Sequence, residues 1–207
     1  MTLSRSAPIS RTRRSRIGGF SMVELAVSMT VLLILTAIAI PTLMRSFRTY
    51  QLNDAAARLS DMLKLTRFEA VRKNTQINFL MQASGTGWLI GTDSNGNGTI
   101  DAVEKQQLIT GFATLLASGV APSPTAITTA LGGASLNTLS GSAGSVTFDA
   151  RGAIRAGING PVSSSTFVFY IGSLTNPEFG YRAVILLPSG STQIWSAPNG
   201  GAWQQIS

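Results

Sequence analysis

The side chains best suited to chemistry in this 207-residue chain lie in one run, DSNGNGTIDAVE, which ends at Glu104. The run matches the calcium-loop pattern D-x-[DN]-x-[DN]-G-x5-E at every specified position. In such loops the oxygen ligands come mostly from alternate positions, and a glycine, here Gly98, permits the sharp turn. The sequence therefore predicts a calcium site with the ligands Asp93, Asn95, Asn97, the carbonyl of Thr99, Asp101 and Glu104.

A second interpretation of the same run needs no metal. A calcium-binding EF-hand has a helix on each side of its loop, whereas a strand pattern precedes Asp93. Asn-Gly pairs favour tight turns and positive φ, and the run contains both Asn95-Gly96 and Asn97-Gly98. The run is therefore also explained as a connection between two strands, without a cofactor.

Residue types that many enzymes need are missing. The chain has no Cys and no His, which excludes thiolate nucleophiles, Cys/His zinc sites and imidazole acid–base catalysis. Outside the run that ends at Glu104, no carboxylates cluster and no nucleophile has a recognisable base beside it. The sequence therefore predicts a protein that is not an enzyme.

The positive charge of the chain is concentrated at its N-terminus. The sequence has 16 Lys and Arg residues against 9 Asp and Glu, and five of the arginines precede residue 20. Nucleic-acid binding needs basic side chains gathered on a folded surface. Further along the chain, Arg151 and Arg155 are close in sequence, but two exposed arginines are usually just solvated. A nucleic-acid partner is therefore not expected.

The basic segment 1–19 leads into an apolar segment, 20–44, in which only Glu24 is ionisable. About 20 apolar residues, each rising ~1.5 Å along a helix, span the ~30 Å hydrocarbon core of a membrane. Basic residues before such a segment stay on the cytoplasmic side. The sequence therefore predicts a single membrane-spanning helix with its N-terminus in the cytoplasm.

Other kinds of N-terminal signal explain fewer of these residues. A secretory signal peptide could end at Ala37-Ile38-Ala39, but its apolar run would be long and would contain Glu24. An uncleaved signal anchor explains the length but gives the glutamate no role. A twin-arginine signal at Arg13-Arg14 lacks a cofactor motif downstream. None of the three accounts for both the length of the segment and its glutamate.

The residues at the start of the apolar segment resemble a processing site. The sequence GGFSMVEL, residues 18–25, is similar to the prepilin peptidase site of type IV pilins and type II secretion pseudopilins. The resemblance implies that a membrane aspartyl peptidase cuts after Gly19 and methylates Phe20, the new N-terminal residue. It also makes Glu24 the fifth residue of the mature chain, where the family has its glutamate. Pro41 falls where the family often has a helix-kinking proline.

The position of Glu24 suits a role in assembly. A carboxylate near the start of a membrane helix is costly unless it is paired, and a free N-terminal amine, its own or a neighbouring subunit's, is a suitable partner. In the family this pairing sets the axial register between subunits. The alternative is that Glu24 lies at the headgroup boundary, where the positive end of the helix dipole favours it. The leader-cleavage context favours the assembly role.

Helical patterning resumes after Pro41. The proline should bend or weaken the helix, because it lacks an N–H and its ring crowds the preceding turn. In 45–74 small and apolar residues recur every three or four positions, and charged residues mostly occupy the others, which predicts an amphipathic helix. We therefore expect one long helix over about 20–73, its first half in lipid or a fibre and its second half covered on one face.

Residues 75–207 predict a β-sheet domain, with the short apolar runs and Gly, Pro and Asn turns that are typical of strands. Ala, Ser, Thr and Gly dominate 113–145, where we expect an irregular, partly mobile loop. Trp195 and Trp203 are expected to be buried, one in the core and one at a sheet edge. A long helix followed by one antiparallel sheet is an α+β architecture. The expected strands are Gln76–Gln82, Trp88–Gly91, Gln107–Phe112, Val146–Asp149, Thr166–Ile171, Arg182–Leu187 and Thr192–Trp195.

The order of these elements is similar to that of the GspH/FimT type of minor pseudopilins, as are the runs Arg67–Arg72, Gly87-Trp88 and Phe148–Gly152. The resemblance implies a structural subunit of the periplasmic pseudopilus of a type II secretion system, anchored in the inner membrane with its C-terminal domain in the periplasm. It implies other pseudopilins, the prepilin peptidase and an inner-membrane assembly platform as partners. The alternative is a minor pilin of a type IV pilus, for adhesion, motility or DNA uptake, because both systems share the processing and the helix packing.

Two further functions depend on single segments. Some FimT-like proteins bind DNA through a G-R-x-R motif near the C-terminus, but the corresponding turn here reads Gly190-Ser191-Thr192-Gln193, without either arginine. The electrostatic contribution that dominates non-specific DNA binding is then missing. Calcium bound at Asp93–Glu104 would indicate a third class of function, a calcium-regulated periplasmic binding module on an anchor.

Overall fold

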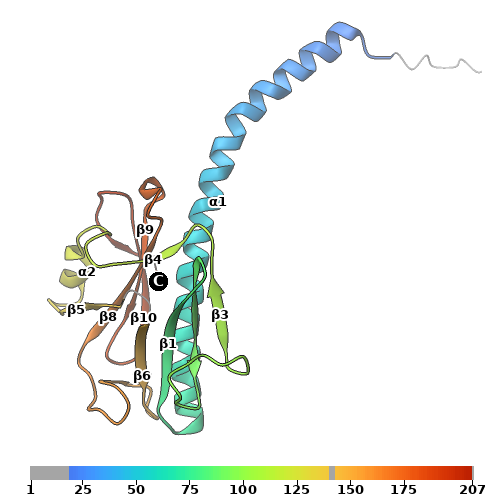
Figure 1. The fold of residues 1–207 in the computed structure, drawn as a ribbon. Coiled ribbons are helices and arrows are strands. Elements are labelled where there is room, and N and C mark those ends of the chain that lie inside the picture. The colour runs from blue at the N-terminus through green and yellow to red at the C-terminus, as the bar shows by residue number, and fades with distance from the viewer. Residues whose placement is uncertain (1–18, 140–142, 207) are drawn as a thin grey trace, which may run out of the picture. The chain divides into compact units, whose positions relative to one another are not determined.

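The computed structural model describes residues 19–139 and 143–206 (Figure 1). All but the last residue of the predicted basic leader 1–19 lie outside these ranges. The chain divides into two compact units, Met1–Thr42 and Leu43–Ser207. The described part begins with a long helix, followed by antiparallel strands, which confirms the predicted α+β class.

Helix α1 runs over Met22–Lys73, so it begins two residues after the predicted start at Phe20. It contains Pro41, and the division between the two compact units falls directly after that proline. An 18-residue window near the N-terminal end of α1 has a mean hydropathy of 2.4, and none of it is buried. This part of α1 is long and apolar enough to cross a membrane.

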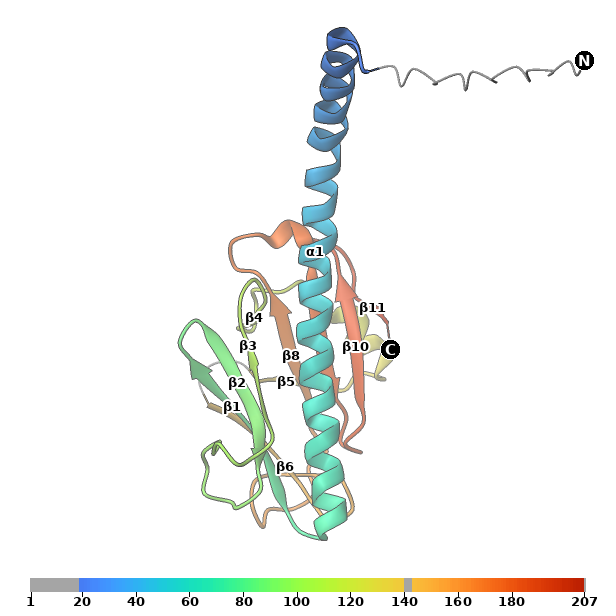
Figure 2. The ribbon, with the colours of Figure 1, turned by 90° about the vertical axis from the view of Figure 1, so that its right-hand side faces the viewer.

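The C-terminal part of α1 has one buried face, as the amphipathic pattern predicts. Small and aliphatic side chains at three- and four-residue spacing make this face a close-packing surface for the strands that follow. Figure 2 shows α1 running alongside strands of the domain. The buried residues of the helix are Leu52, Ala55, Ala56, Leu59, Ser60, Met62, Leu63, Thr66 and Ala70.

The strands form two sheets, so the expectation of one sheet was wrong. The first sheet has the order β3-β2-β1-β6-β7, and the second has the order β11-β10-β9-β8-β4 with β5 also paired to β8. The strands of the first sheet are β1 Ile77–Ser84, β2 Gly87–Asp93, β3 Gln106–Ile109, β6 Ala143–Phe148 and β7 Ile154–Arg155. Those of the second are β4 Thr114–Leu116, β5 Leu136–Thr138, β8 Thr166–Gly172, β9 Tyr181–Leu186, β10 Thr192–Ala197 and β11 Gln204–Gln205.

The central strand β9 of the second sheet is covered on both faces. Every residue of β9 is buried. Val184 and Leu186 join the core formed with α1 and the first sheet, whereas Ala183 and Ile185 join a separate core on the opposite face. A strand with apolar side chains on both faces needs cover on both. Here α1 and the first sheet cover one face of β9, and the second core covers the other.

The segment 113–145 is more regular than the irregular loop expected there. Within its described residues it contains β4, the short helix α2 Thr125–Ala130, β5 and the first residues of β6. Ile127 of α2 is fully buried in the second core. β5 pairs in parallel with β8, and β4 pairs antiparallel with the other end of the same strand. The expected strand Gln107–Phe112 ends earlier, at Ile109.

The two C-terminal tryptophans are buried, as predicted. Trp195 and Trp203 both belong to the second core and expose 4% and 3% of their surface. The indole N–H of Trp203 donates to the Pro122 carbonyl at 3.1 Å, and its ring lies 5.7 Å from that of Tyr170. Trp203 therefore fastens the chain end and the segment before α2 to the same face of the second sheet.

Three polar side chains of α1, each seven residues from the next, contact the strand domain. Seven residues are close to two helical turns, so the three contacts lie along one line of the helix. They fix which face of α1 meets the sheets. One of the partners is the buried Arg182, and burial lowers the pKa of its guanidinium. The contacts are Asn53 Oδ1 with Arg182 Nε at 2.6 Å, Ser60 Oγ with Thr192 Oγ1 at 2.9 Å, and Arg67 Nε with the Gly152 carbonyl at 3.1 Å.

Gly190, in the turn between β9 and β10, should tolerate no side chain. Its φ is +78°, and a Cβ there would lie 2.2 Å from the Gly152 carbonyl oxygen and 2.9 Å from Arg67 Nε. Gly190→Ala should lower the free energy of unfolding by more than the ~1–2 kcal/mol that the left-handed conformation alone costs. Thermal and denaturant unfolding of the full chain in detergent, followed by circular dichroism, measures the loss.

The matched control for this change is Gly200→Ala. Gly200 has a φ of +71°, but a Cβ there would have no atom within 4 Å. The control should therefore show the conformational cost without the clash. Equal losses in the two variants would contradict the close packing of Gly190 against Gly152 and Arg67.

Candidate functional site

The predicted processing site lies at the beginning of the described chain. Gly19, Phe20 and Ser21 precede the first residue of α1 and are not helical. The Phe20 side chain is 80% exposed. The backbone N–H of Leu25 donates to the Ser21 carbonyl at 3.0 Å, which closes the first turn. The Gly19–Phe20 peptide bond is therefore extended from the helix and exposed, as a peptidase substrate must be.

Glu24 lies in the first turn of α1 and is exposed. Within the described residues it forms no ion pair. The positive end of the helix dipole favours a carboxylate at this position. Its charge is thus available to a group from outside the described chain, and the predicted pairing with an N-terminal amine stays a prediction.

Three threonine hydroxyls of the apolar segment form hydrogen bonds within the helix. The hydroxyls of Thr30, Thr36 and Thr42 each donate to the carbonyl four residues earlier, at 2.8, 2.7 and 3.4 Å. Such bonds remove the cost of placing a hydroxyl in hydrocarbon. Glu24 is the one ionisable side chain of the apolar segment, so its charge would be costly in lipid without a partner.

The second candidate site, the Asp93–Glu104 loop, connects β2 to β3. Asp93 ends β2 and is 1% exposed. Its Oδ1 accepts from the backbone N–H of Gly96 at 2.6 Å and of Asn97 at 3.1 Å, and its Oδ2 accepts from the N–H of Gly98 at 3.0 Å. One buried carboxylate thus holds three successive amides of the turn, because a charged acceptor makes the stronger hydrogen bonds.

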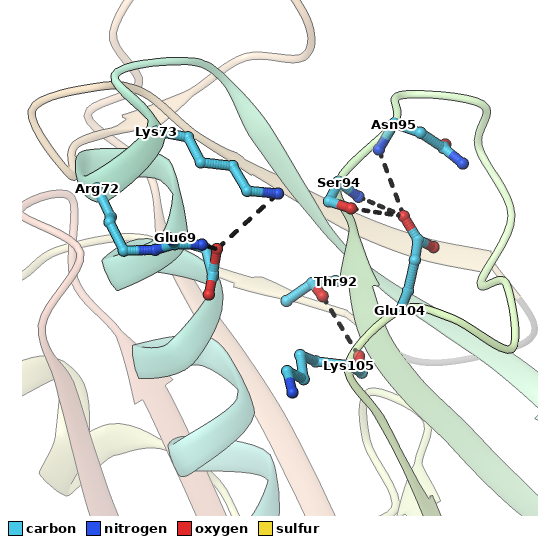
Figure 3. Close-up of polar contacts among 8 residues, drawn as sticks. All are labelled: Glu69, Arg72, Lys73, Thr92, Ser94, Asn95, Glu104 and Lys105. Atoms are coloured by element: carbon cyan, nitrogen blue, oxygen red, sulfur yellow. Dashed lines mark hydrogen bonds and ion pairs between the residues drawn. The ribbon is translucent and has the colours of Figure 1, made fainter.

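Glu104 closes the loop from the other end (Figure 3). Its Oε1 accepts from the backbone N–H and the hydroxyl of Ser94, at 2.6 and 3.0 Å, and from the N–H of Asn95 at 3.3 Å. Its Oε2 accepts from the N–H of Asp101 at 3.0 Å. Figure 3 shows the Ser94 backbone nitrogen and hydroxyl and the Asn95 backbone nitrogen directed at one oxygen of the Glu104 carboxylate. The two loop ends are therefore joined through this one side chain.

The remaining predicted ligands also bond within the loop. The Asp101 carboxylate accepts from the side-chain amides of Asn95 and Asn97 at 2.8 and 2.9 Å, and the Asn97 Oδ1 accepts from the N–H of Thr99 at 2.9 Å. The six predicted calcium ligands thus belong to one connected loop. In the described part of the chain, however, no three His, Cys, Asp or Glu side chains gather into a group that could hold a metal ion.

A buried polar network that the sequence did not indicate attaches this loop to the first sheet. Asn78 of β1 donates from Nδ2 to the Asp93 Oδ2 at 3.2 Å, and Thr147 of β6 donates to the Asn78 Oδ1 at 2.8 Å. Both are almost fully buried. A Cβ on Gly91 would lie 2.8 Å from Ile100, so the loop folds back closely over β2. The sequence marks Asn78 of β1 and Thr147 of β6 only as polar residues at alternate positions of their strands, and this does not indicate that they form one buried network.

Asp93→Asn should destabilise the loop even without metal. The carboxylate accepts four hydrogen bonds, and an amide would replace one acceptor oxygen by a donor that faces N–H groups. We expect a loss of about 2 kcal/mol, since a hydrogen bond to a charged group contributes ~1.5–3 kcal/mol. Thermal denaturation in millimolar calcium and in chelator measures it, with the exposed Asp61→Asn as control. If the hydrogen bonds alone matter, Asp93→Asn should lose the same stability in calcium and in chelator. If the melting temperature of the wild type rises in calcium, the loop is a calcium site.

Comparison with known proteins identifies the family of the chain. Residues 55–190 match the family model described as Type II transport protein GspH. No curated protein sequence matches the chain. The type IV minor pilin FimU of Pseudomonas aeruginosa is similar at 18% identity and a TM-score of 0.45, over 75% of this chain and 98% of that one. Its second crystal form gives 16% identity and a TM-score of 0.34, over 76% and 90%.

The family match covers more than half of the chain, from the buried part of α1 to the turn between β9 and β10. The first sheet, strands β4, β5, β8 and β9 of the second sheet, and the Asp93–Glu104 loop fall inside it, whereas β10 and β11 follow it. The apolar part of α1 precedes it, as a membrane anchor precedes the folded domain in pilin-like proteins. The chain therefore belongs to the GspH family of pilin-like subunits, which assemble with other pilins or pseudopilins.

Proposed function

We propose that the chain is a minor pseudopilin, a structural subunit of the periplasmic pseudopilus of a type II secretion system. The observation that carries this proposal is the match of residues 55–190 to the family described as Type II transport protein GspH. The residues before that match support it independently, because the exposed Gly19–Phe20 bond and Glu24 have the spacing of a prepilin processing site. A minor pilin of a type IV pilus is the alternative that uses the same features.

Membrane anchoring follows from the same helix. The chain would cross the inner membrane once through the apolar part of α1, with the arginines of segment 1–19 in the cytoplasm and the Leu43–Ser207 unit in the periplasm. The exposed apolar side chains of the helix cannot remain in water. In the membrane they would meet lipid, and in the pseudopilus they would meet the helices of other subunits delivered by the assembly platform.

Cleavage after Gly19 would create the group that Glu24 needs. Hydrolysis of the Gly19–Phe20 bond leaves a free amine on Phe20, which the peptidase would then methylate. An amine that keeps its positive charge in or near a membrane is a strong partner for a carboxylate. Pairing between Glu24 of one subunit and the amine of its neighbour would set the axial register of the fibre.

Gly19→Leu should leave the full-length precursor uncleaved. A peptidase that reads a glycine before the cut has no space for a branched side chain, whereas Gly19→Ala adds a single methyl group and should still be processed at least in part. Mass spectrometry of the membrane-bound protein measures the N-terminus. Recovery of chains that begin at Phe20 from the Gly19→Leu variant would contradict the proposed processing site.

Glu24→Val should permit membrane insertion but prevent incorporation into the pseudopilus. Valine suits the apolar segment, so the anchor is kept while the partner of the N-terminal amine is lost. The control is Thr30→Val, which also makes this helix more apolar but leaves the carboxylate. Cross-linking to other pseudopilins and secretion of the type II cargo measure the effect. Normal secretion together with normal type IV pili would contradict the register role, whereas loss of the pili with normal secretion would keep that role and favour the alternative function.

A further inference from the structure

The end of the apolar segment has the composition of a membrane interface. Residues 20–44 contain enough residues, at ~1.5 Å each, to cross the ~30 Å hydrocarbon core. Arg45, Phe47, Arg48 and Tyr50 follow directly. Phe47 and Tyr50 are 59% and 65% exposed. Aromatic side chains gather at the headgroup level of membranes, and arginine extends its charge there from an apolar stem.

Arg48 is held in place rather than freely solvated. Its guanidinium carbon lies 4.7 Å from the centre of the Phe112 ring, and its Nη1 donates to Gln51 Oε1 at 3.1 Å. The Phe112 ring in turn meets that of Phe179 edge to face, with centroids 5.3 Å apart. Two segments far apart in the sequence, before β4 and before β9, thus meet the first turns of α1 in the Leu43–Ser207 unit.

The segment between β8 and β9 adds exposed apolar surface at the same end of the domain. Leu174 is 69% exposed there. In Figure 2 this segment, in orange, lies beside α1. The acidic residue of the segment, Glu178, accepts from the Asn176 side chain at 3.2 Å. Arg45 and Arg48 have no carboxylate partner within the described residues, so this end keeps a positive surplus.

We propose that this surface, the rim formed by Arg45, Phe47, Arg48, Tyr50 and Phe112, binds the phosphate groups of phospholipid heads in the outer leaflet of the inner membrane. The inference rests on the proposed membrane anchoring and adds the partner of the domain itself. The two guanidinium groups meet phosphate oxygens, and the aromatic rings occupy the layer between the heads and the acyl chains. The rim holds the domain against the membrane until the subunit leaves for the fibre.

Continuity with the anchor is what selects lipid as the partner. The rim begins one residue after Met44, the last residue of the apolar segment. A subunit whose anchor is in the bilayer therefore cannot keep these side chains away from the headgroups. Anionic lipid attracts a nearby Arg or Lys by about 1 kcal/mol each, which is a roughly fivefold effect.

Labelling of single cysteines in the full chain tests the proposal, because the chain has no cysteine of its own. A fluorophore is attached after Leu174→Cys, in the β8–β9 segment whose Phe179 meets Phe112 of the rim, or after Val103→Cys, in the β2–β3 loop, where the side chain is 93% exposed. The protein is placed in nanodiscs of anionic phospholipid that carry nitroxide on the headgroup. Quenching should be several-fold stronger at position 174 than at position 103.

Removal of the rim charges should weaken this contact. Arg45→Gln with Arg48→Gln should lower the equilibrium constant for headgroup contact by about 25-fold, since each charge contributes roughly fivefold. Lys105→Gln with Arg151→Gln removes the same number of charges from exposed residues outside the rim, and should leave the quenching unchanged. Every variant should remain bound to the nanodisc. Release of a variant from the nanodisc would contradict the proposed membrane anchoring, which is separate from the proposal that the rim binds headgroups.

Three results would overturn the inference. Equal quenching at positions 174 and 103 would show that the rim does not meet the headgroups. Strong quenching that the Arg45→Gln and Arg48→Gln changes do not reduce would show that phosphate is not the partner. Quenching absent from nanodiscs, with protection of position 174 from labelling only when other pilin-like subunits are present, would assign the rim to a subunit contact.

Discussion

One face of the C-terminal part of α1 must be kept from water, and the strand domain is arranged around that requirement. Burial of apolar surface contributes about 25 cal/mol per Å², and both sheets supply side chains to this face. Phe79 of the first sheet and Phe169 of the second meet edge to face, with centroids 6.1 Å apart. The helix is thus the common element on which two otherwise separate sheets share a core.

An apolar face alone would not fix the rotation of α1, because its small and aliphatic side chains can pack in neighbouring registers. The polar contacts at Asn53, Ser60 and Arg67 remove that freedom. Each partner lies in a different part of the strand domain, and a rotated helix would leave the buried Arg182 without the Asn53 oxygen. A buried polar group without a partner costs ~1–3 kcal/mol. Packing therefore supplies stability, and these contacts supply a single arrangement.

Local patterns predicted the elements that are long or strongly periodic, which are α1, the strands with apolar alternation and the buried tryptophans. They could not predict β4 and β5, since three residues carry no period and both strands are defined by their pairing with the distant β8. The Asp93–Glu104 loop shows a different limit. Carboxylate and amide oxygens that suit calcium also accept backbone N–H groups, and the sequence pattern is the same in both cases. Asn78, which anchors the loop, is marked in the sequence only as a polar residue at an alternate position of its strand, and this does not reveal its partner Asp93.

The parts of the chain to which the proposed function assigns assembly are those that its own core does not hold. Gly19, Phe20 and Glu24 are exposed, and the apolar window of α1 has no buried residue. A soluble protein could not carry such a surface without aggregating, so the membrane must shield it until other subunits do. The polar groups of the two parts of the chain also differ. In the described strand domain the buried side-chain polar atoms have hydrogen-bond partners, with the exception of Gln107 Oε1. Glu24 forms no ion pair within the described residues, and in the proposed function its partner is the amine that cleavage creates. If the proposed processing occurs, assembly would be coupled to it, because the uncleaved precursor has no free amine at Phe20.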